Sequence, residues 1–209
     1  MKERNAEKSR AMILAAAEKE FAEKGFYGAR VDEIAASAGI NKRMIYAYFG
    51  DKEELYKQIL RQSYSKMEEV EELLAEQNLT GEALITGIIN AYFDFLSDNP
   101  SFVNILMWEN LNKGRYLREV ESTAIERKTI GCFIQSIEEG KKSGVFRKNI
   151  DPLQTVLSLI TTCFSNFSNQ YTLSKLFRTD LTDRENIEIR KKHTAELMKT
   201  YICEVQTNA

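Results

Sequence analysis

The chain has 209 residues, of which 43% are hydrophobic and 29% charged, and its formal net charge is −2. This apolar content excludes a disordered chain, and so small a net charge excludes a general nucleic-acid coat protein, which needs a large excess of lysine and arginine. Only two prolines and ten glycines interrupt the chain, and because both residues break helices, their scarcity predicts an all-α fold with almost no β-sheet.

The first predicted helix covers about residues 6–24. Ile13, Ala17 and Phe21 recur at spacings of four, which is the pattern of an amphipathic helix that buries one stripe. Gly25 follows directly, and glycine is the usual residue just past a helix end. The sequence therefore predicts one helix and then a turn.

Two short helices follow. Residues 31–38 form the first, Gly39 allows a tight reversal, and Asn41 can cap the second, which continues to Phe49. Ile45 and Phe49, four apart, face inward. The rest of this helix carries basic, aromatic and small side chains over its outer face and flanks, namely Lys42, Arg43, Met44, Tyr46, Ala47 and Tyr48.

A long fourth helix begins at the capping box from Asp51 to Glu54. Two short helices joined by a glycine turn, the second with a basic and aromatic surface, are the parts of a helix-turn-helix. Spacing alone leaves a second interpretation open, a generic helical hairpin with a solvated positive end.

Residues 25–55 resemble the DNA-binding signature of the TetR family. The matching runs are Gly25-Phe26, Val31-Asp32-Glu33-Ile34-Ala35, Ala38-Gly39-Ile40 and Ile45-Tyr46-Ala47-Tyr48-Phe49-Gly50-Asp51-Lys52-Glu53-Glu54-Leu55. Glycine placement, core positions and the final capping box agree together, which makes the signal specific. The resemblance implies an N-terminal three-helix helix-turn-helix DNA-binding domain, residues 1–57, followed by a larger helical effector-binding and dimerisation domain, residues 58–209.

By this resemblance the helix that starts near Asn41 lies in the major groove of operator DNA. The implied DNA-binding residues are Arg30, Lys42, Arg43, Met44, Tyr46, Tyr48 and Lys52. Arg43 suits two hydrogen bonds to a guanine, although a contact to phosphate alone stays open. Family members commonly have Thr or Ser where this chain has Ala29-Arg30, so a hydroxyl cap is missing and Arg30 takes over the phosphate in our interpretation.

Helix signals continue through the rest of the chain. We expect helices from Thr80 to about Ser97, from Asn99-Pro100 onward, from about Arg115 to Lys142, from Asp151-Pro152 through the uncharged residues 152–174, and from the capping box at Thr182.

Residues 152–174 carry no charge over 23 positions, but twelve of these are Gln, Thr, Ser or Asn, which is too polar for a membrane span. We expect two covered faces instead, with an apolar stripe of Leu153, Val156, Leu157, Ile160, Phe164 and Phe167. The last helix offers Ile187, Thr194, Met198 and Tyr201 as its partner. The resemblance implies a homodimer through the helices near 152–174 and 182–204, which suits a palindromic operator.

The back domain of this family usually encloses an effector pocket. Aromatic residues of the middle helices are therefore candidate contacts to an unidentified small hydrophobic or aromatic effector, namely Tyr92, Trp108, Phe133, Phe164 and Phe167. Each of them also fits plain core packing. The sequence does not say whether the regulator represses or activates.

Other functions find less support. His193 is the single histidine, and the chain shows no HExxH, P-loop, Rossmann or nucleophile-elbow pattern, so we expect no enzyme, cofactor or metal site. A helical interaction module with a vestigial helix-turn-helix, and a regulator without an effector, stay as alternatives. Three scattered cysteines and the lack of an apolar leader favour a cytoplasmic protein.

Overall fold

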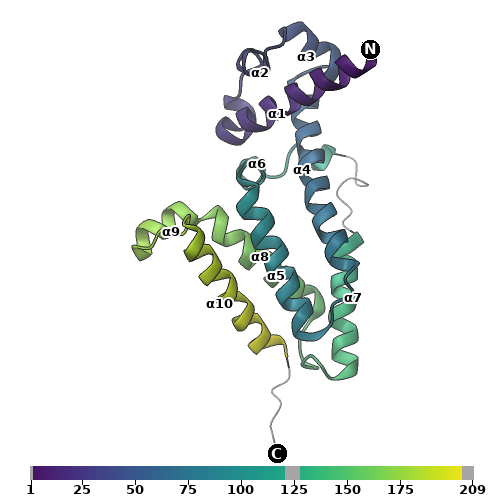
Figure 1. Ribbon diagram of the computed structural model, residues 1–209, viewed down its shortest axis with the longest axis vertical. Helices are drawn as coiled ribbons and strands as arrows, with labels where there is room; N and C mark the ends of the chain where they lie inside the picture. The colour runs from purple at the N-terminus through teal and green to yellow at the C-terminus, as the bar shows by residue number, and fades with distance from the viewer. Residues whose placement is uncertain (1, 121–127, 204–209) are drawn as a thin grey trace, which may run out of the picture. The chain divides into compact units, whose positions relative to one another are not determined.

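The computed structural model describes residues 2–120 and 128–203. Within these ranges the chain forms helices, turns and one isolated antiparallel bridge between Phe146 and Cys203 (Figure 1). The helices are α1 (Lys2–Gly28), α2 (Val31–Ala38), α3 (Lys42–Phe49), α4 (Lys52–Ala75), α5 (Gly81–Asp98), α6 (Pro100–Leu111), the 3₁₀ helix η1 (Leu117–Glu119), α7 (Lys128–Ser143), α8 (Pro152–Ser168), α9 (Gln170–Phe177) and α10 (Arg184–Ile202). The predicted all-α fold is confirmed.

The chain divides into two compact units. Unit 1 comprises Met1–Lys66 and Pro100–Glu126, and unit 2 comprises Met67–Asn99 and Arg127–Ala209. Residues 100–120 thus pack with the first four helices, although 33 residues of unit 2 precede them in the chain. The predicted boundary at residue 57 concerns DNA and effector binding, which packing does not test, and it stays a prediction.

The core of unit 1 follows the predicted stripe of α1. Ile13, Ala17 and Phe21 are fully buried, and the helix breaks at Gly25, whose φ of 65° and ψ of 179° are non-helical. Trp108 from α6 packs on this glycine, because a Cβ added at Gly25 would lie 2.6 Å from Trp108 Cδ2. The indole Nε1 also donates a hydrogen bond to the Ala22 carbonyl at 3.2 Å.

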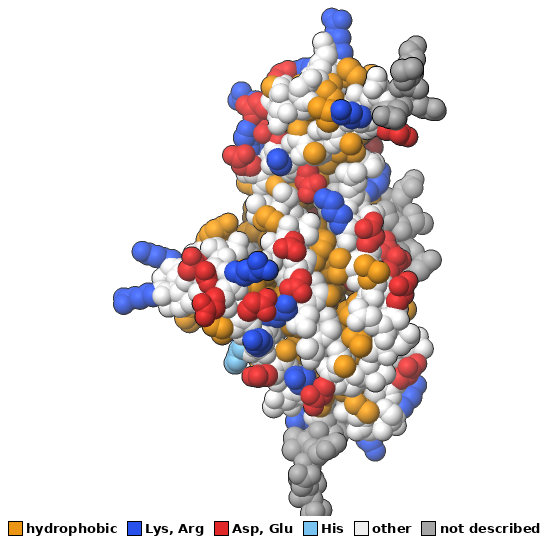
Figure 2. All heavy atoms as spheres, viewed as in Figure 1, with side chains coloured by type: hydrophobic (Ala, Val, Ile, Leu, Met, Phe, Trp, Pro, Cys, Tyr) orange, Lys and Arg blue, Asp and Glu red, His pale blue; other side chains and the backbone are white. Residues whose placement is uncertain are grey.

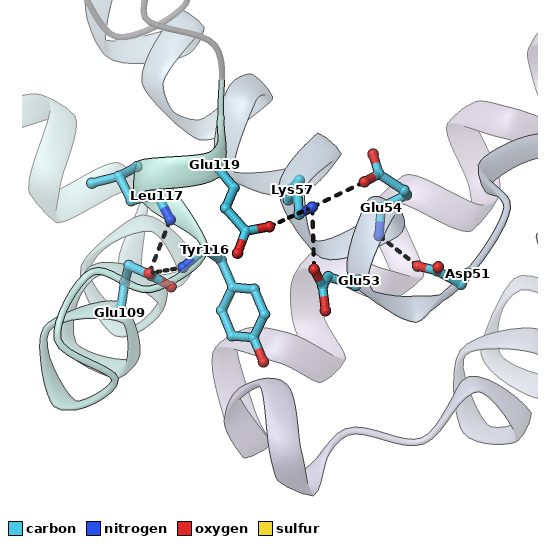
Figure 3. A network of polar contacts seen from close by, with 8 residues as sticks. All are labelled: Asp51, Glu53, Glu54, Lys57, Glu109, Tyr116, Leu117 and Glu119. Carbon is cyan, nitrogen blue, oxygen red and sulfur yellow. Dashed lines mark hydrogen bonds and ion pairs between the residues drawn. The ribbon is translucent and has the colours of Figure 1, made fainter.

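The segment after α6 departs from the predicted long helix over residues 115–142. Residues 115–120 form a turn and η1, and α7 begins at Lys128; residues 121–127 lie outside the described residues. The buried Glu109 carboxylate accepts hydrogen bonds from Tyr116 N at 2.8 Å and from Leu117 N at 3.0 Å (Figure 3). These amides therefore have a partner outside a helix, and the Tyr116 and Val120 side chains enter the core of unit 1.

In unit 2, α5 packs against α8 and α10. The buried face of α8 differs from the predicted stripe: it consists of Thr155, Val156, Leu159, Cys163, Asn166 and Phe167. Leu153 and Leu157 are exposed by 55% and 49%. The prediction was wrong here because the helix has apolar residues on both faces, so that periodicity could not show which face α5 covers.

The predicted partner stripe on the last helix also divides between two faces. Ile187, Thr194 and Met198 are buried in the core of unit 2, whereas Tyr201 is exposed by 55%. Three of the four residues proposed for a subunit contact therefore pack within their own chain.

The sequence predicts one helix through the uncharged segment 152–174. The structure instead has two helices there, α8 and the start of α9. Asn169 separates α8 from α9 with φ of −114° and ψ of 6°. Its side-chain Nδ2 donates to the Ser165 carbonyl at 3.1 Å, and its own carbonyl accepts from Leu173 N at 2.9 Å. An asparagine side chain that competes for backbone groups in this way lets the chain change direction.

Candidate DNA-binding surface and effector site

The turn between α2 and α3 is set by short-range contacts. Gly39 adopts the left-handed conformation with φ of 63° and ends α2, while the Asn41 side chain accepts a hydrogen bond from Arg43 N and caps α3. Ile45 is 1% exposed and anchors α3 to the core. The opposite face of α3 is therefore presented outward by a fixed scaffold.

Arg43 lies on this outward face. Its side chain is exposed and has no ion-pair partner among the described residues. Tyr46 is 42% exposed, and Met44 is half-buried. An unpaired guanidinium beside an apolar and a phenolic side chain can meet base edges, a thymine methyl group and phosphates.

Lys42 and Tyr48 are more constrained. The Lys42 ammonium pairs with Asp32 at 2.8 Å, and this hydrogen bond raises the lysine pKa. Tyr48 is half-buried, with the Arg10 guanidinium 5.2 Å from the centre of its ring. Arg10 on α1 thus lies beside α3, a candidate that sequence reasoning missed because the stripe of α1 shows only its inner face.

Arg30 and Lys52 lie at helix starts, where backbone N–H groups favour anions. Arg30 precedes α2 without a side-chain cap, as the missing hydroxyl predicts, and its own N–H donates to Glu20 at 3.2 Å. Lys52 begins α4, and its ammonium lies 4.7 Å from the centre of the Phe26 ring. Partial burial lowers the Lys52 pKa.

The start of α4 is tied to the segment after α6. Lys57 is 8% exposed, and its ammonium contacts the carboxylates of Glu119, Glu54 and Glu53 at 2.9, 3.0 and 3.2 Å (Figure 3). The hydrogen bonds to Glu119 and Glu54 raise the Lys57 pKa. This network holds η1 against α4 within unit 1.

The candidate effector residues do not form one group. Trp108 belongs to unit 1, whereas Tyr92, Phe133, Phe164 and Phe167 belong to unit 2. Phe133 and Phe167 are buried, Phe164 is half-buried, and Phe167 packs edge-on against Phe93 at 5.5 Å.

Tyr92 is one member of a buried polar cluster. Its hydroxyl donates to the carboxylate of Glu71, which is fully buried and also accepts from Thr129 Oγ1 at 2.7 Å. Glu71 stands in the run Glu68-Glu69-Val70-Glu71-Glu72, whose composition is typical of a solvated helix face. Only the packing of α4, α5 and α7 buries it.

The surface carries both signs of charge intermixed over the visible face (Figure 2). No helix of the described chain is long and apolar enough to cross a membrane. Among the described residues, no group of three or more His, Cys, Asp or Glu side chains is placed to hold a metal ion. The glycine turn after α2, the Asn41 cap and the exposed face of α3 together define a helix-turn-helix protein.

Comparison with known proteins agrees with a helix-turn-helix protein. Residues 13–59 match the family model of bacterial regulatory proteins of the tetR family, and residues 82–198 match that of the tetracyclin repressor-like C-terminal domain. The HTH-type transcriptional repressor NicS of Pseudomonas putida is 33% identical over 86% of this chain and 85% of its own. The repressor SCO4008 of Streptomyces coelicolor is 32% identical over 77% of this chain and 78% of its own.

Among solved structures, the regulator FadR of Bacillus subtilis in complex with stearoyl-CoA superposes with a TM-score of 0.69 at 20% identity, over 91% of this chain and 98% of its own. The chain belongs to the TetR family of transcriptional regulators.

Proposed function

We propose that this protein is a homodimeric repressor that binds a palindromic operator through α3 and is released by a small hydrophobic or aromatic effector. The observation that carries the DNA-binding part is the exposed Arg43, which pairs with no acid of the described chain and lies on a capped helix anchored by the buried Ile45. The names of two relatives, both transcriptional repressors, support repression. Its place of action is then the cytoplasm, where operator DNA lies.

The side chains divide by role. Arg43 reads a base, with Met44 and Tyr46 beside it, while Lys52, Arg30 and Tyr48 contact phosphates. Lys42 must exchange Asp32 for a phosphate, and this exchange costs little because both partners are substantially exposed.

A second copy of the chain would cover apolar side chains on α8 and α10. Among these, the exposed residues are Leu153, Leu157, Ile189, Leu197 and Tyr201. On α10 the last three lie at spacings of four and eight, on one face of the helix. Two such helices from each subunit make a four-helix interface, which would pair two recognition helices about 34 Å apart for successive major grooves.

The effector would bind in unit 2 near Tyr92, Phe133, Phe164 and Phe167. The FadR complex shows that a protein of similar fold holds an acyl-CoA. Such a ligand releases DNA only if it binds the two conformations of the regulator unequally. The separate contacts of Trp108 with α1 favour a structural role for that residue.

Selection of bound duplexes from a random library at near-physiological salt tests the proposal first. We expect a palindrome, which would also establish the dimer and supply the operator for an effector screen. Binding without sequence enrichment that disappears as salt rises would contradict sequence-specific regulation and favour the interaction-module interpretation.

Variants then separate the roles on the selected operator. Arg43→Ala should weaken binding by about 1–3 kcal/mol and relax preference at one base position, whereas Lys52→Ala should weaken all sequences alike and reduce the salt slope by about one. Lys148→Ala, which removes an exposed cation of unit 2, is the matched control and should bind normally. A uniform loss for Arg43→Ala would show that Arg43 contacts only phosphate.

A further inference from the structure

Unit 2 contains a cavity whose lining includes none of the effector residues of the proposed function. Its volume is about 660 Å³, within the range of small-molecule sites. Helices α8, α9 and α10 and the α9–α10 turn form its walls. The lining residues are Thr161, Thr162, Ser165, Asn166, Leu173, Phe177, Thr179, Leu181 and Arg190.

One buried polar group in this lining lacks a partner. Asn166 is 6% exposed, and its Nδ2 has no hydrogen-bond partner within the part of the chain that the structure describes. A buried amide N–H without an acceptor is destabilising, and native structures contain few such groups. An acceptor on a bound molecule would satisfy it.

The charge of the lining favours an anion. Arg190 is exposed and has no ion-pair partner among the described residues, and the lining includes no Asp or Glu. Ser165 Oγ accepts from Asn169 Nδ2 at 3.3 Å, so its own O–H can donate to a ligand. The donors of the lining thus match the oxygens of a carboxylate.

Three lining residues are apolar, and the turn that carries Leu181 is held in place. Leu173, Phe177 and Leu181 present hydrocarbon to the cavity, and Phe177 is 68% exposed. The Ser174 hydroxyl accepts a hydrogen bond from Leu181 N at 2.9 Å, which fixes the turn after α9 to that helix. Asn186 Nδ2 donates to the Asp180 carbonyl at 2.8 Å and fixes the same turn to α10.

We propose that this cavity binds a small amphipathic carboxylate. The carboxylate would accept hydrogen bonds from Asn166 Nδ2 and the Arg190 guanidinium, and the apolar body would lie against Leu173, Phe177 and Leu181. This site shares no residue with the effector candidates of the proposed function. It is tested by ligand binding without DNA, so its failure and the failure of the proposed function are distinguishable.

Isothermal titration of the full chain with octanoate is the direct test, with octan-1-ol as the neutral match of the same chain length. We expect saturable octanoate binding that Arg190→Gln weakens at least about tenfold, because a charge-assisted hydrogen bond is lost. Octan-1-ol should bind more weakly than octanoate, and Arg190→Gln should change its affinity by less than about twofold. Lys192→Gln, which removes an exposed cation of α10 outside the lining, should leave octanoate binding unchanged.

Asn166→Leu separates a ligand role from a structural one. Removing an unsatisfied buried amide should raise the thermal midpoint by about 2–4 °C without ligand, while octanoate binding falls at least about tenfold. A lower midpoint with unchanged octanoate binding would overturn the assignment of Asn166.

Three other results would overturn the proposal as a whole. These are no octanoate binding by the unaltered protein at millimolar concentration, equal losses for Arg190→Gln and Lys192→Gln, and a shift of the sedimentation coefficient of Arg190→Gln with unchanged octanoate affinity. The last result would make the cavity part of a subunit interface.

Discussion

Two buried polar side chains of unit 2 lack the hydrogen-bond partners that a buried carboxylate of unit 1 has within the described chain. In unit 1 the Glu109 carboxylate accepts three hydrogen bonds, from Tyr116 N, Leu117 N and the Tyr56 hydroxyl at 3.2 Å. In unit 2, Asn166 Nδ2 and Thr194 Oγ1 are buried without a partner in the described chain. A satisfied buried group fixes one arrangement, whereas an unsatisfied one lowers stability until something binds it. Unit 2 satisfies its buried Glu71 carboxylate in the same way, so the contrast between the units rests on Asn166 and Thr194, whose polar capacity is left for a ligand.

Glu109→Ala should cause the largest loss of unfolding free energy. A small loss would contradict the difference drawn between the two units. The substitution leaves three donors without their acceptor, so we expect unit 1 to lose roughly 3–5 kcal/mol of unfolding free energy. Trp108 is the single tryptophan and belongs to unit 1, so its fluorescence during urea unfolding reports on that unit. Glu109→Gln, which keeps one acceptor, should lose less; equal losses would mean that the carboxylate hydrogen bonds do not stabilise the segment.

Gly25→Ala should cost about 2–3 kcal/mol, because the new Cβ would meet the Trp108 ring and the φ of 65° disfavours any residue with a Cβ. Gly39→Ala is the matched control: its φ is 63°, but nothing lies within 4 Å of the added Cβ, so we expect about 1 kcal/mol. Trp108 fluorescence during urea unfolding measures the stability of both variants. The emission of the folded protein should shift to the red in Gly25→Ala alone. Equal costs would show that α6 yields readily at this contact.

Thr194→Val should have the smallest effect and the opposite sign. The substitution keeps the shape of the side chain and removes a buried hydroxyl without a partner, so unit 2 should gain about 1 kcal/mol. Far-ultraviolet circular dichroism during urea unfolding measures it, since Trp108 does not report on unit 2. A loss of stability would mean that the hydroxyl has a partner, which would weaken the contrast between the units.

Much of the candidate DNA-binding surface could be predicted from the sequence. The bounds of α2, the cap at Asn41, the buried Ile45 and the missing hydroxyl cap before α2 all agree with the structure. Arg10 beside Tyr48 and the pairing of Lys42 with Asp32 were not predicted, because they join residues that lie in different helices.

What the sequence by itself determined is local: where helices begin and end at caps and glycines, and the inner face of a helix that has only one apolar stripe. These features depend on groups a few residues apart, whose spacing the chain fixes. Tertiary structure alone decided which face of α8 is buried, that residues 115–120 leave the helical path, and where a cavity opens beside Asn166. In each case the outcome depends on a competing partner from a distant segment, such as the Glu109 carboxylate for the amides of Tyr116 and Leu117, and no local pattern records that partner.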